Sequence, residues 1–404
     1  MEEKLDKKKT DWQKNIFIFK TNSFFNWFQV AIGVWVLIWT KYLDFTQIAA
    51  IYSISLIWST FLELPTGALA DMIGRKKTVI IGRAINIIAN IVYLLANNFP
   101  LFLIGNILYQ TNWAFESGAQ SALLYDSLKE NGQEKKLYKK TETDTFFYCT
   151  VGMVFASVLG GFLYRYGVHT PYIACVVASI ISFIIVLFFQ EPALDSKKFT
   201  LKNYLQQNID GVKHIFENKM IRSISFFSFI ITFITYAALW YLYEPRLAAG
   251  GFNPELMGLL VAGTYVVRAI GTKLVPVLDK KLKKSQVPIF LALLQSIGSF
   301  LSFIPGKVGA ITSVYSRKFA DGFRNPIVAT LQNEQIESKY RATSLSAISL
   351  FTNLLIGLSG PIIGLLNDKY GPSITLGLFG FIGIIICLPL AINLSNMIKK
   401  HNFN

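Results

Sequence analysis

Long apolar stretches recur along the whole chain, and they limit the folds it can adopt more than any other feature. Each has about 20 residues, which is enough for a helix to cross a hydrocarbon core of ~30 Å. Backbone groups inside a bilayer need internal partners, so we interpret these stretches as helices rather than open strands. We predict an all-α integral membrane protein with twelve transmembrane helices, at residues 16–39, 46–70, 78–96, 101–124, 145–164, 172–189, 221–243, 256–278, 287–304, 308–331, 343–366 and 374–394.

The composition agrees with a membrane location. Apolar residues make up 52% of the chain and charged residues 16%, against roughly 25% charged residues in an average soluble domain. The three cysteines, Cys149, Cys175 and Cys387, all lie in predicted spans. Buried thiols behave as small apolar groups, and their spacing fits neither a disulfide framework nor a metal site. The first span is longer than the apolar region of a signal peptide, so we expect it to be retained.

Basic residues give the chain a net charge of +15, and their distribution indicates a topology. They precede the first span and follow the second, fourth, eighth and tenth, with Arg75, Lys76, Lys77 and Arg83 after the second. The opposite loops contain Lys41, Arg165, Arg246, Lys307 and Lys369. By the positive-inside rule, this asymmetry predicts a cell-membrane protein with both termini in the cytoplasm. Membrane lipids, and not nucleic acid, are the expected partners of the basic excess.

A polar interruption at residues 191–219 divides the chain into an N-terminal half at 1–190 and a C-terminal half at 220–404. This cytoplasmic linker fits a surface-lying amphipathic helix and an ordinary solvated segment about equally well. Similar features recur about 204 to 208 residues apart, as with Gly118 and Gly322 or Asp71 and Asp279. The common spacing favours a duplicated six-helix architecture.

A charged turn joins the second and third spans, and its sequence is Gly67-Ala-Leu-Ala-Asp71-Met-Ile-Gly74-Arg75-Lys76-Lys77. It resembles the loop between helices 2 and 3 of the major facilitator superfamily, whose pattern is G-x-L-x-D-x-x-G-R-K/R. The segment from Glu116 to Asp126 is similar to bacterial permeases of that superfamily with unknown substrates. The match departs from the family in the first span, which has no carboxylate.

The resemblance implies two pseudo-symmetric six-helix bundles and a conformational switch at this loop. In the family, the acid at the position of Asp71 meets the start of helix 11, which begins here at Thr343. The family's arginine, here Arg75, pairs with an acid at the end of helix 4, matched by Asp126. The alternative is that the basic residues only set the topology. The predicted switch residues are Gly67, Asp71, Gly74, Arg75, Lys76 and Asp126.

Ionisable residues at membrane depth are costly and usually functional. Glu116 lies ~15 Å along the helix from Asp126, near the middle of the fourth span. The family's cavity is lined by helices 1, 4, 7 and 10, so we expect Glu116 to be a proton or substrate carboxylate. The alternative role is a structural ion pair with an arginine of helix 10.

The tenth span carries Arg317, Asp321 and Arg324 on one helical face. Asp321 can pair with either arginine, which leaves the other for Glu116 or for an anionic substrate; pure ion pairing between the halves is an equal alternative. Lys318 lies off this face, and Glu244 with Arg246 fits an interfacial pair at the outer surface. The predicted cavity residues are Glu116, Trp113, Arg317, Asp321, Arg324 and Glu63.

These features predict a secondary transporter that works by alternating access, with proton-coupled efflux of an amphipathic compound or drug as the leading function. Transport of a polar or anionic metabolite is the alternative, and a non-transporting membrane receptor is a third. No G-x-x-x-x-G-K-[ST] loop or nucleophile constellation occurs, so we expect neither an ATPase nor another enzyme. We expect a monomer that binds a small-molecule substrate, with no cofactor or metal and with the proton gradient as energy source.

Overall fold

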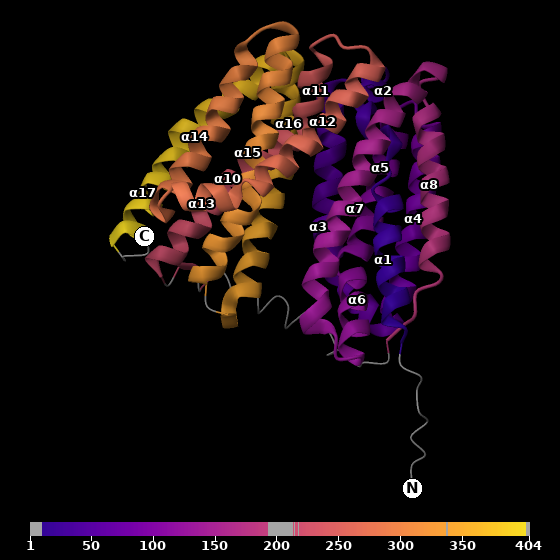
Figure 1. The fold of residues 1–404 in the computed structure, drawn as a ribbon. Helices are drawn as coiled ribbons and strands as arrows, with labels where there is room; N and C mark the ends of the chain where they lie inside the picture. Colours follow the sequence, from indigo (N-terminus) through magenta and orange to yellow (C-terminus); the bar gives the residue numbers. More distant parts are fainter. Residues whose placement is uncertain (1–9, 193–212, 214, 217, 337, 401–404) are drawn as a thin grey trace. The chain divides into compact units, whose positions relative to one another are not determined.

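The computed structural model describes residues 10–192, 213, 215–216, 218–336 and 338–400, and helices are the regular elements of this part of the chain (Figure 1). Each predicted span falls on helical residues, which confirms the all-α membrane fold. The linker helix predicted within 191–219 falls mainly on residues outside the described part and stays a prediction.

The helices of the N-terminal half follow the predicted spans with several interruptions. They are α1 (Trp12–Asn26), the 3-10 turn η1 (Val30–Gly33), α2 (Trp35–Trp39), α3 (Phe45–Ile73), α4 (Arg75–Leu95), α5 (Phe99–Ser117), α6 (Ala119–Glu130), α7 (Glu134–Leu163), the 3-10 turn η2 (Tyr164–Tyr166) and α8 (Thr170–Val186).

The C-terminal half is built in the same way from helices with short irregular turns. They are α10 (Lys219–Tyr241), α11 (Tyr243–Ala248), α12 (Pro254–Lys273), α13 (Val275–Lys281), η3 (Lys284–Gln286), α14 (Val287–Phe300), η4 (Leu301–Phe303), α15 (Gly306–Gln335), α16 (Ser338–Ile382), the π-helical turn η5 (Gly383–Cys387) and α17 (Leu388–Lys400).

Seven helical segments of the described residues are long and apolar enough, by length and composition, to cross a membrane. Helix breaks, a short helix and the merging of two spans account for much of the difference from the twelve predicted spans. The first predicted span is broken between α1 and α2, and the sixth corresponds to α8, an apolar helix of 17 residues. The eleventh and twelfth spans form one continuous segment, in which Gly371 makes the turn with φ of 78°.

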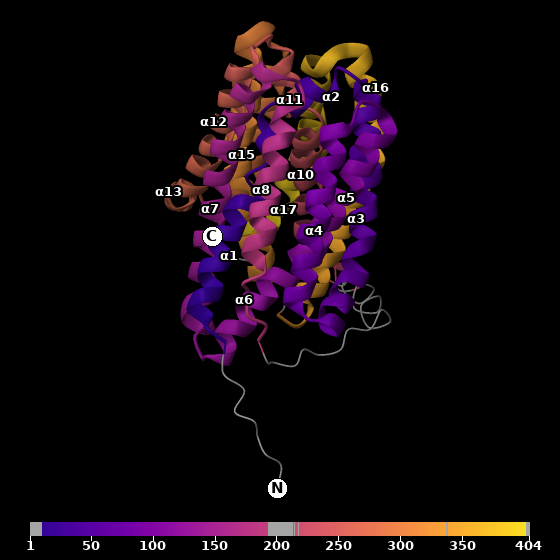
Figure 2. The same ribbon diagram turned by 90° about the vertical axis from the view of Figure 1, so that its right-hand side faces the viewer.

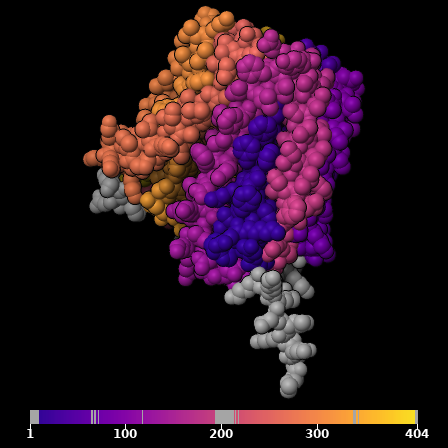
Figure 3. Space-filling model, turned by 45° about the vertical axis from the view of Figure 1, so that its right-hand side comes forward, coloured from indigo at the N-terminus to yellow at the C-terminus, as the bar shows by residue number. Residues whose placement is uncertain are grey.

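The described residues fall into two compact units. The first contains 10–32 and 58–192. Within it α1 packs against α6, α7 and α8, while α4 packs against α5 and α8. Figure 1 and Figure 2 both show α1 and α7 side by side, and Figure 3 shows the surface of α1 between those of its neighbours. Apolar side chains such as Ile18, Leu123 and Val186 form its core.

The second unit contains 33–57 and the described residues from 213 onward. Within it α10 packs against α15, α16 and α17, and α14 contacts the same three helices. Residues of 33–57 belong to the apolar core of this unit, where Val36 and Ala49 cluster with Ile356 and Ile363. The Ser53 and Tyr241 hydroxyls are also hydrogen bonded, at 3.1 Å. The domain boundaries predicted from the linker are not tested by this grouping and stay a prediction.

Candidate functional site

Two helix interruptions in the first unit occur close to buried polar residues. The helix α1 ends at Asn26, and helical structure resumes at Val30. The helices α5 and α6 meet at Gly118, directly after Ser117. Breaks of this kind are tolerated at membrane depth where the freed groups find protein partners, and in transporters they occur at substrate and ion sites.

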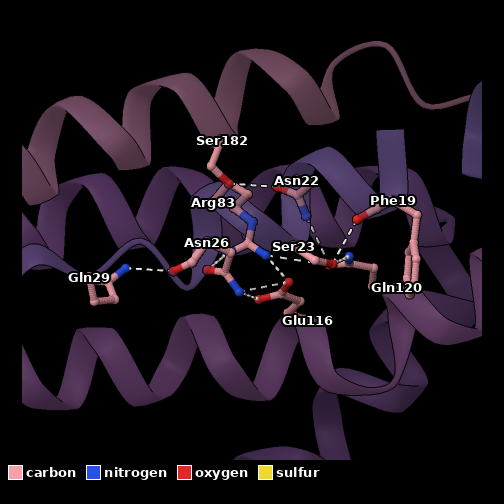
Figure 4. A network of polar contacts seen from close by, with 9 residues as sticks. All are labelled: Phe19, Asn22, Ser23, Asn26, Gln29, Arg83, Glu116, Gln120 and Ser182. Atoms are coloured by element: carbon pink, nitrogen blue, oxygen red, sulfur yellow. Dashed lines mark hydrogen bonds and ion pairs between the residues drawn. The ribbon is translucent and has the colours of Figure 1, made fainter. Parts of the chain in front are cut away.

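A buried ion pair lies beside these interruptions (Figure 4). Arg83 of α4 is 0% exposed and Glu116 of α5 is 7% exposed. The Arg83 Nη2 group donates to Glu116 Oε1, and Nη1 donates to Asn26 Oδ1. Removing two opposite charges from water costs solvation free energy. Their mutual attraction offsets this cost only if their remaining donors and acceptors also form hydrogen bonds. This pair therefore needs the polar neighbours that surround it.

Amide side chains complete the network around the ion pair (Figure 4). Asn26 Nδ2 donates to both Glu116 oxygens, at 3.2 and 3.1 Å. Gln120 of α6 accepts from Arg83 at 3.5 Å and from Asn22 Nδ2 at 3.2 Å. Ser182 of α8 then donates to Asn22 Oδ1 at 2.7 Å. The network thus joins five helices of one bundle to a single pair of charges.

Arg83 is not among the predicted site residues, because the charge count groups it with the basic residues that follow the second span. The structure places it inside α4, within the third predicted span, where it is fully buried. A signal was present in the sequence, because Arg83, Asn86 and Asn90 recur at helical spacing and are all buried. The partner of Glu116 is therefore an arginine of the third span rather than one of helix 10.

Trp113 contributes an aromatic ring on α5, one turn from Glu116. Its ring centroid lies 5.1 Å from that of Trp27, which stands in the interruption after α1, and the two rings are nearly perpendicular. Both tryptophans are partly exposed. Glu63 of α3 is exposed and takes no part in the hydrogen bonds of the Arg83 network given above.

The loop between α3 and α4 has the turn that its glycine predicts. Gly74 has φ of 96°, a conformation that glycine adopts without the steric cost of a side chain. The structure brings Arg75 and Asp126 together in an ion pair. Glu191 accepts from the backbone N–H groups of Arg75 at 2.7 Å and Lys76 at 2.6 Å. This carboxylate caps the start of α4, where the helix dipole favours negative charge.

Other parts of the predicted switch lie outside what the structure describes. Gly67 and Asp71 fall within the bounds of α3, but the surroundings of Gly67 and the side chain of Asp71 lie outside the described part. The contact predicted between Asp71 and the start of helix 11 at Thr343 therefore stays a prediction.

The arginines of α15 have fixed partners in the second unit. Arg317 donates to four neutral oxygens: Tyr243 Oη at 2.9 Å, Gln295 O at 3.2 Å, Ile234 O at 2.7 Å and Ser299 Oγ. Arg324 pairs with Asp321 at 3.0 Å. Asp321 also pairs with Arg268 of α12 at 2.9 Å. The sequence allowed Asp321 to pair with either Arg317 or Arg324. In the structure it pairs with Arg324, and Arg268 is its second partner.

Comparison with known proteins shows which family the chain matches. The family model "Major Facilitator Superfamily" matches residues 149–361, more than half of the 404-residue chain. A second model, "Sugar (and other) transporter", matches residues 38–203.

One curated relative and one solved structure extend the likeness to most of the chain, and a second relative covers about two thirds of it. "Uncharacterized MFS-type transporter YxaM" of Bacillus subtilis (strain 168) is 21% identical over 374 residues, covering 89% of this chain and 91% of the relative. "Multidrug resistance protein 2" of the same organism is 24% identical over 282 residues, covering 65% and 66%. The nucleoside transporter NupG shares the fold with a TM-score of 0.74 at 16% identity, covering 95% of this chain and 99% of NupG. The chain therefore belongs to the Major Facilitator Superfamily, a family of membrane transporters and not of enzymes.

Proposed function

We propose that this transporter uses a proton gradient to export a small amphipathic organic compound by alternating access. The observation that carries the proposal is the buried Arg83–Glu116 ion pair. The partly exposed rings of Trp27 and Trp113 beside it, and the similarity to a protein named for multidrug resistance, support an amphipathic substrate. We place the protein in the cell membrane as a monomer with cytoplasmic termini and no cofactor.

The proposed coupling step is protonation of Glu116. A proton on this carboxylate removes its charge, so Arg83 loses its ionic partner and is held by the amide oxygens of Asn26 and Gln120. Because Asn26 is the last residue of α1 before the interruption, a shift of Arg83 acts directly on the position of that helix end. A proton that favours one conformer by a few kcal/mol changes the populations of the two states accordingly.

Transport of a polar or anionic metabolite is the second candidate. The buried positive charges of α15 favour it, and the fold is shared with a nucleoside transporter. In this case the Arg83–Glu116 pair keeps its coupling role, and only the solute differs. The two candidates are separated by the charge of the solute that is moved.

The coupling proposal predicts that Glu116→Gln abolishes the response to a pH gradient. In proteoliposomes, an imposed gradient should drive transport of one of two amphipathic dyes, cationic ethidium or anionic carboxyfluorescein, by the wild type. The variant should lose about tenfold or more of that rate because the titrating group is gone. Dye exchange without a gradient should persist in the variant.

The matched control is Asp144→Asn. It removes the Lys20–Asp144 ion pair, at 2.6 Å, from the same bundle but outside the Arg83 network. We expect this variant to keep the gradient response. If Glu116→Gln responds to the gradient as the wild type does, Glu116 is not the coupling group.

A further inference from the structure

Buried positive charge exceeds buried negative charge among the described residues of the C-terminal half. Four buried cations stand against two buried carboxylates, and these residues are Arg246, Arg317, Lys318, Arg324, Glu244 and Asp321. Unpaired charge in a membrane bundle is expensive, so such an excess calls for a counter-charge or for dense hydrogen bonding.

The three arginines meet this requirement within the protein. Arg317 has its four oxygen acceptors, and Arg324 has Asp321. Arg246 donates to Ser302 Oγ at 3.0 Å and to the backbone oxygen of Ile304 at 2.9 Å. The expected Arg246–Glu244 pair at the outer surface is wrong, because both residues are buried and Arg246 binds these oxygens instead.

Lys318 differs from the arginines. It lies off the face shared by Arg317, Asp321 and Arg324, yet it is only 3% exposed. Among the residues that the structure describes, its ammonium group makes neither a hydrogen bond nor an ion pair. Nζ instead lies 5.5 Å from the ring centroid of Tyr243 and 5.2 Å from that of Tyr265. Aromatic faces attract a cation but do not neutralise it.

The carboxylates near Lys318 do not complete its pairing. Glu244, 8% exposed on α11, and Asp321 both interact with Lys318 electrostatically, but neither forms an ion pair with it. Asp321 is already held by Arg268 and Arg324. A lysine ammonium is a compact charge with three donors and no acceptor capacity, so it lacks an anionic partner here.

We propose that Lys318 binds the anionic oxygen group, a carboxylate or a phosphate, of the organic solute that this transporter carries. The bound anion supplies the missing counter-charge. The rings of Tyr243 and Tyr265 lie near the Lys318 ammonium, where the anion would bind. Glu244 opposes anion binding and so limits its affinity. The inference rests on the proposed function in one respect, that the protein moves an organic solute, and it narrows the substrate class to organic anions.

The test measures ligand binding to the purified full-length protein in detergent, through the shift of its melting temperature with ligand concentration. The probes share one aromatic ring and differ in charge: benzoate, phenyl phosphate, neutral benzamide and cationic benzylamine. We expect benzoate or phenyl phosphate to stabilise the wild type more than the other two. Lys318→Met, which keeps the apolar stem, should weaken anion binding about tenfold or more, and Lys318→Arg should retain most of it.

Lys307→Met is the matched control, because Lys307 is an exposed lysine of the same helix that also lies over an aromatic ring, that of Phe252 at 5.8 Å. It should leave the anion response unchanged. Glu244→Gln should strengthen anion binding about tenfold, since it removes a like charge. A gain of this kind cannot come from misfolding.

Three outcomes overturn the proposal: no stabilisation by either anion, equal stabilisation by benzamide or benzylamine, or an anion response that survives Lys318→Met. These results are independent of proton coupling, because binding in detergent needs no gradient. A failure of the Glu116→Gln experiment therefore leaves the Lys318 assignment standing, and the reverse also holds.

Discussion

At the scale of single residues, two glycines of the first unit have opposite surroundings. A Cβ atom on Gly160 of α7 would collide with the carbonyl oxygen of Val30, in the interrupted stretch between α1 and α2. A Cβ atom on Gly118 would meet nothing within 4 Å. Close backbone approach through glycine is a common way to pack membrane helices. Only the packing of the bundle separates the two positions.

This difference predicts unequal effects of alanine. Gly160→Ala should destabilise the protein by about 1–3 kcal/mol, as overpacking does, because a backbone carbonyl cannot move aside as a side chain can. Gly118→Ala should be neutral or stabilising by up to about 1 kcal/mol, since it adds a better helix former. Melting temperatures of the two variants in detergent measure this. Equal melting temperatures would show that α7 does not approach Val30 closely.

At the scale of elements, the start of α3 is held by carboxylates from two directions. Asp44 accepts from the backbone N–H of Gln47 at 2.7 Å. Asp368 of α16 accepts from the backbone N–H groups of Phe45 at 2.9 Å and Thr46 at 2.8 Å. The second contact links residues more than 300 positions apart, and each carboxylate satisfies donors that the helix itself leaves free.

Asp368→Asn should therefore lower the free energy of unfolding by about 0.5–2 kcal/mol, the usual range for a lost helix cap. The asparagine retains the size of the side chain but has a single acceptor oxygen and no charge. Asp279→Asn is the control, because Asp279 is an exposed carboxylate of the same unit. Thermal denaturation that gives the same midpoint for both variants would contradict the capping role.

The interruption of the first predicted span is also decided at this scale. Residues 16–39 are mostly apolar, although they include Lys20, Asn22, Asn26 and Gln29, and their mean hydropathy predicts one continuous helix. The chain leaves the helix at Trp27 because Asn26 and Gln29 find partners outside the helical hydrogen-bond pattern: Asn26 binds Glu116, and Gln29 Nε2 donates to the Asn26 carbonyl at 2.9 Å. The carboxylate of Glu116 comes from another helix of the bundle, so this partner of Asn26 leaves no trace in a local window of the sequence.

At the scale of the whole molecule, the distribution of lysine and arginine predicts the orientation in the membrane. Exposed lysines mark the loops on each side, with Lys77 at the start of α4 and Lys307 at the start of α15. Two arginines that were counted among the loops, Arg83 and Arg246, are buried. Leaving these two arginines out of the count removes one basic residue from each side of the membrane. The excess of basic residues on the cytoplasmic side is therefore preserved.

Cysteine labelling in intact cells tests this orientation. The native Cys149, Cys175 and Cys387 are all buried, so the wild type should react little with a membrane-impermeant maleimide. Lys307→Cys should be labelled from outside, and Lys77→Cys only after the membrane is permeabilised. The reverse pattern would place both termini outside the cell.

The sequence by itself determined the properties that depend on local pattern. Apolar length predicted the helices, charge asymmetry predicted the orientation, and the Gly67–Lys77 loop predicted the family. Each needs only neighbouring residues, because the bilayer is the same for every span.

The tertiary structure decided how the buried charges are paired. Only helix packing shows that Glu116 meets Arg83, that Arg317 is held by neutral oxygens, and that Lys318 has no ion pair among the described residues. These contacts depend on how each helix is rotated about its axis and on which distant segment packs against it. A buried charge gains or loses several kcal/mol through its partners, and those partners are brought together only when the whole bundle packs.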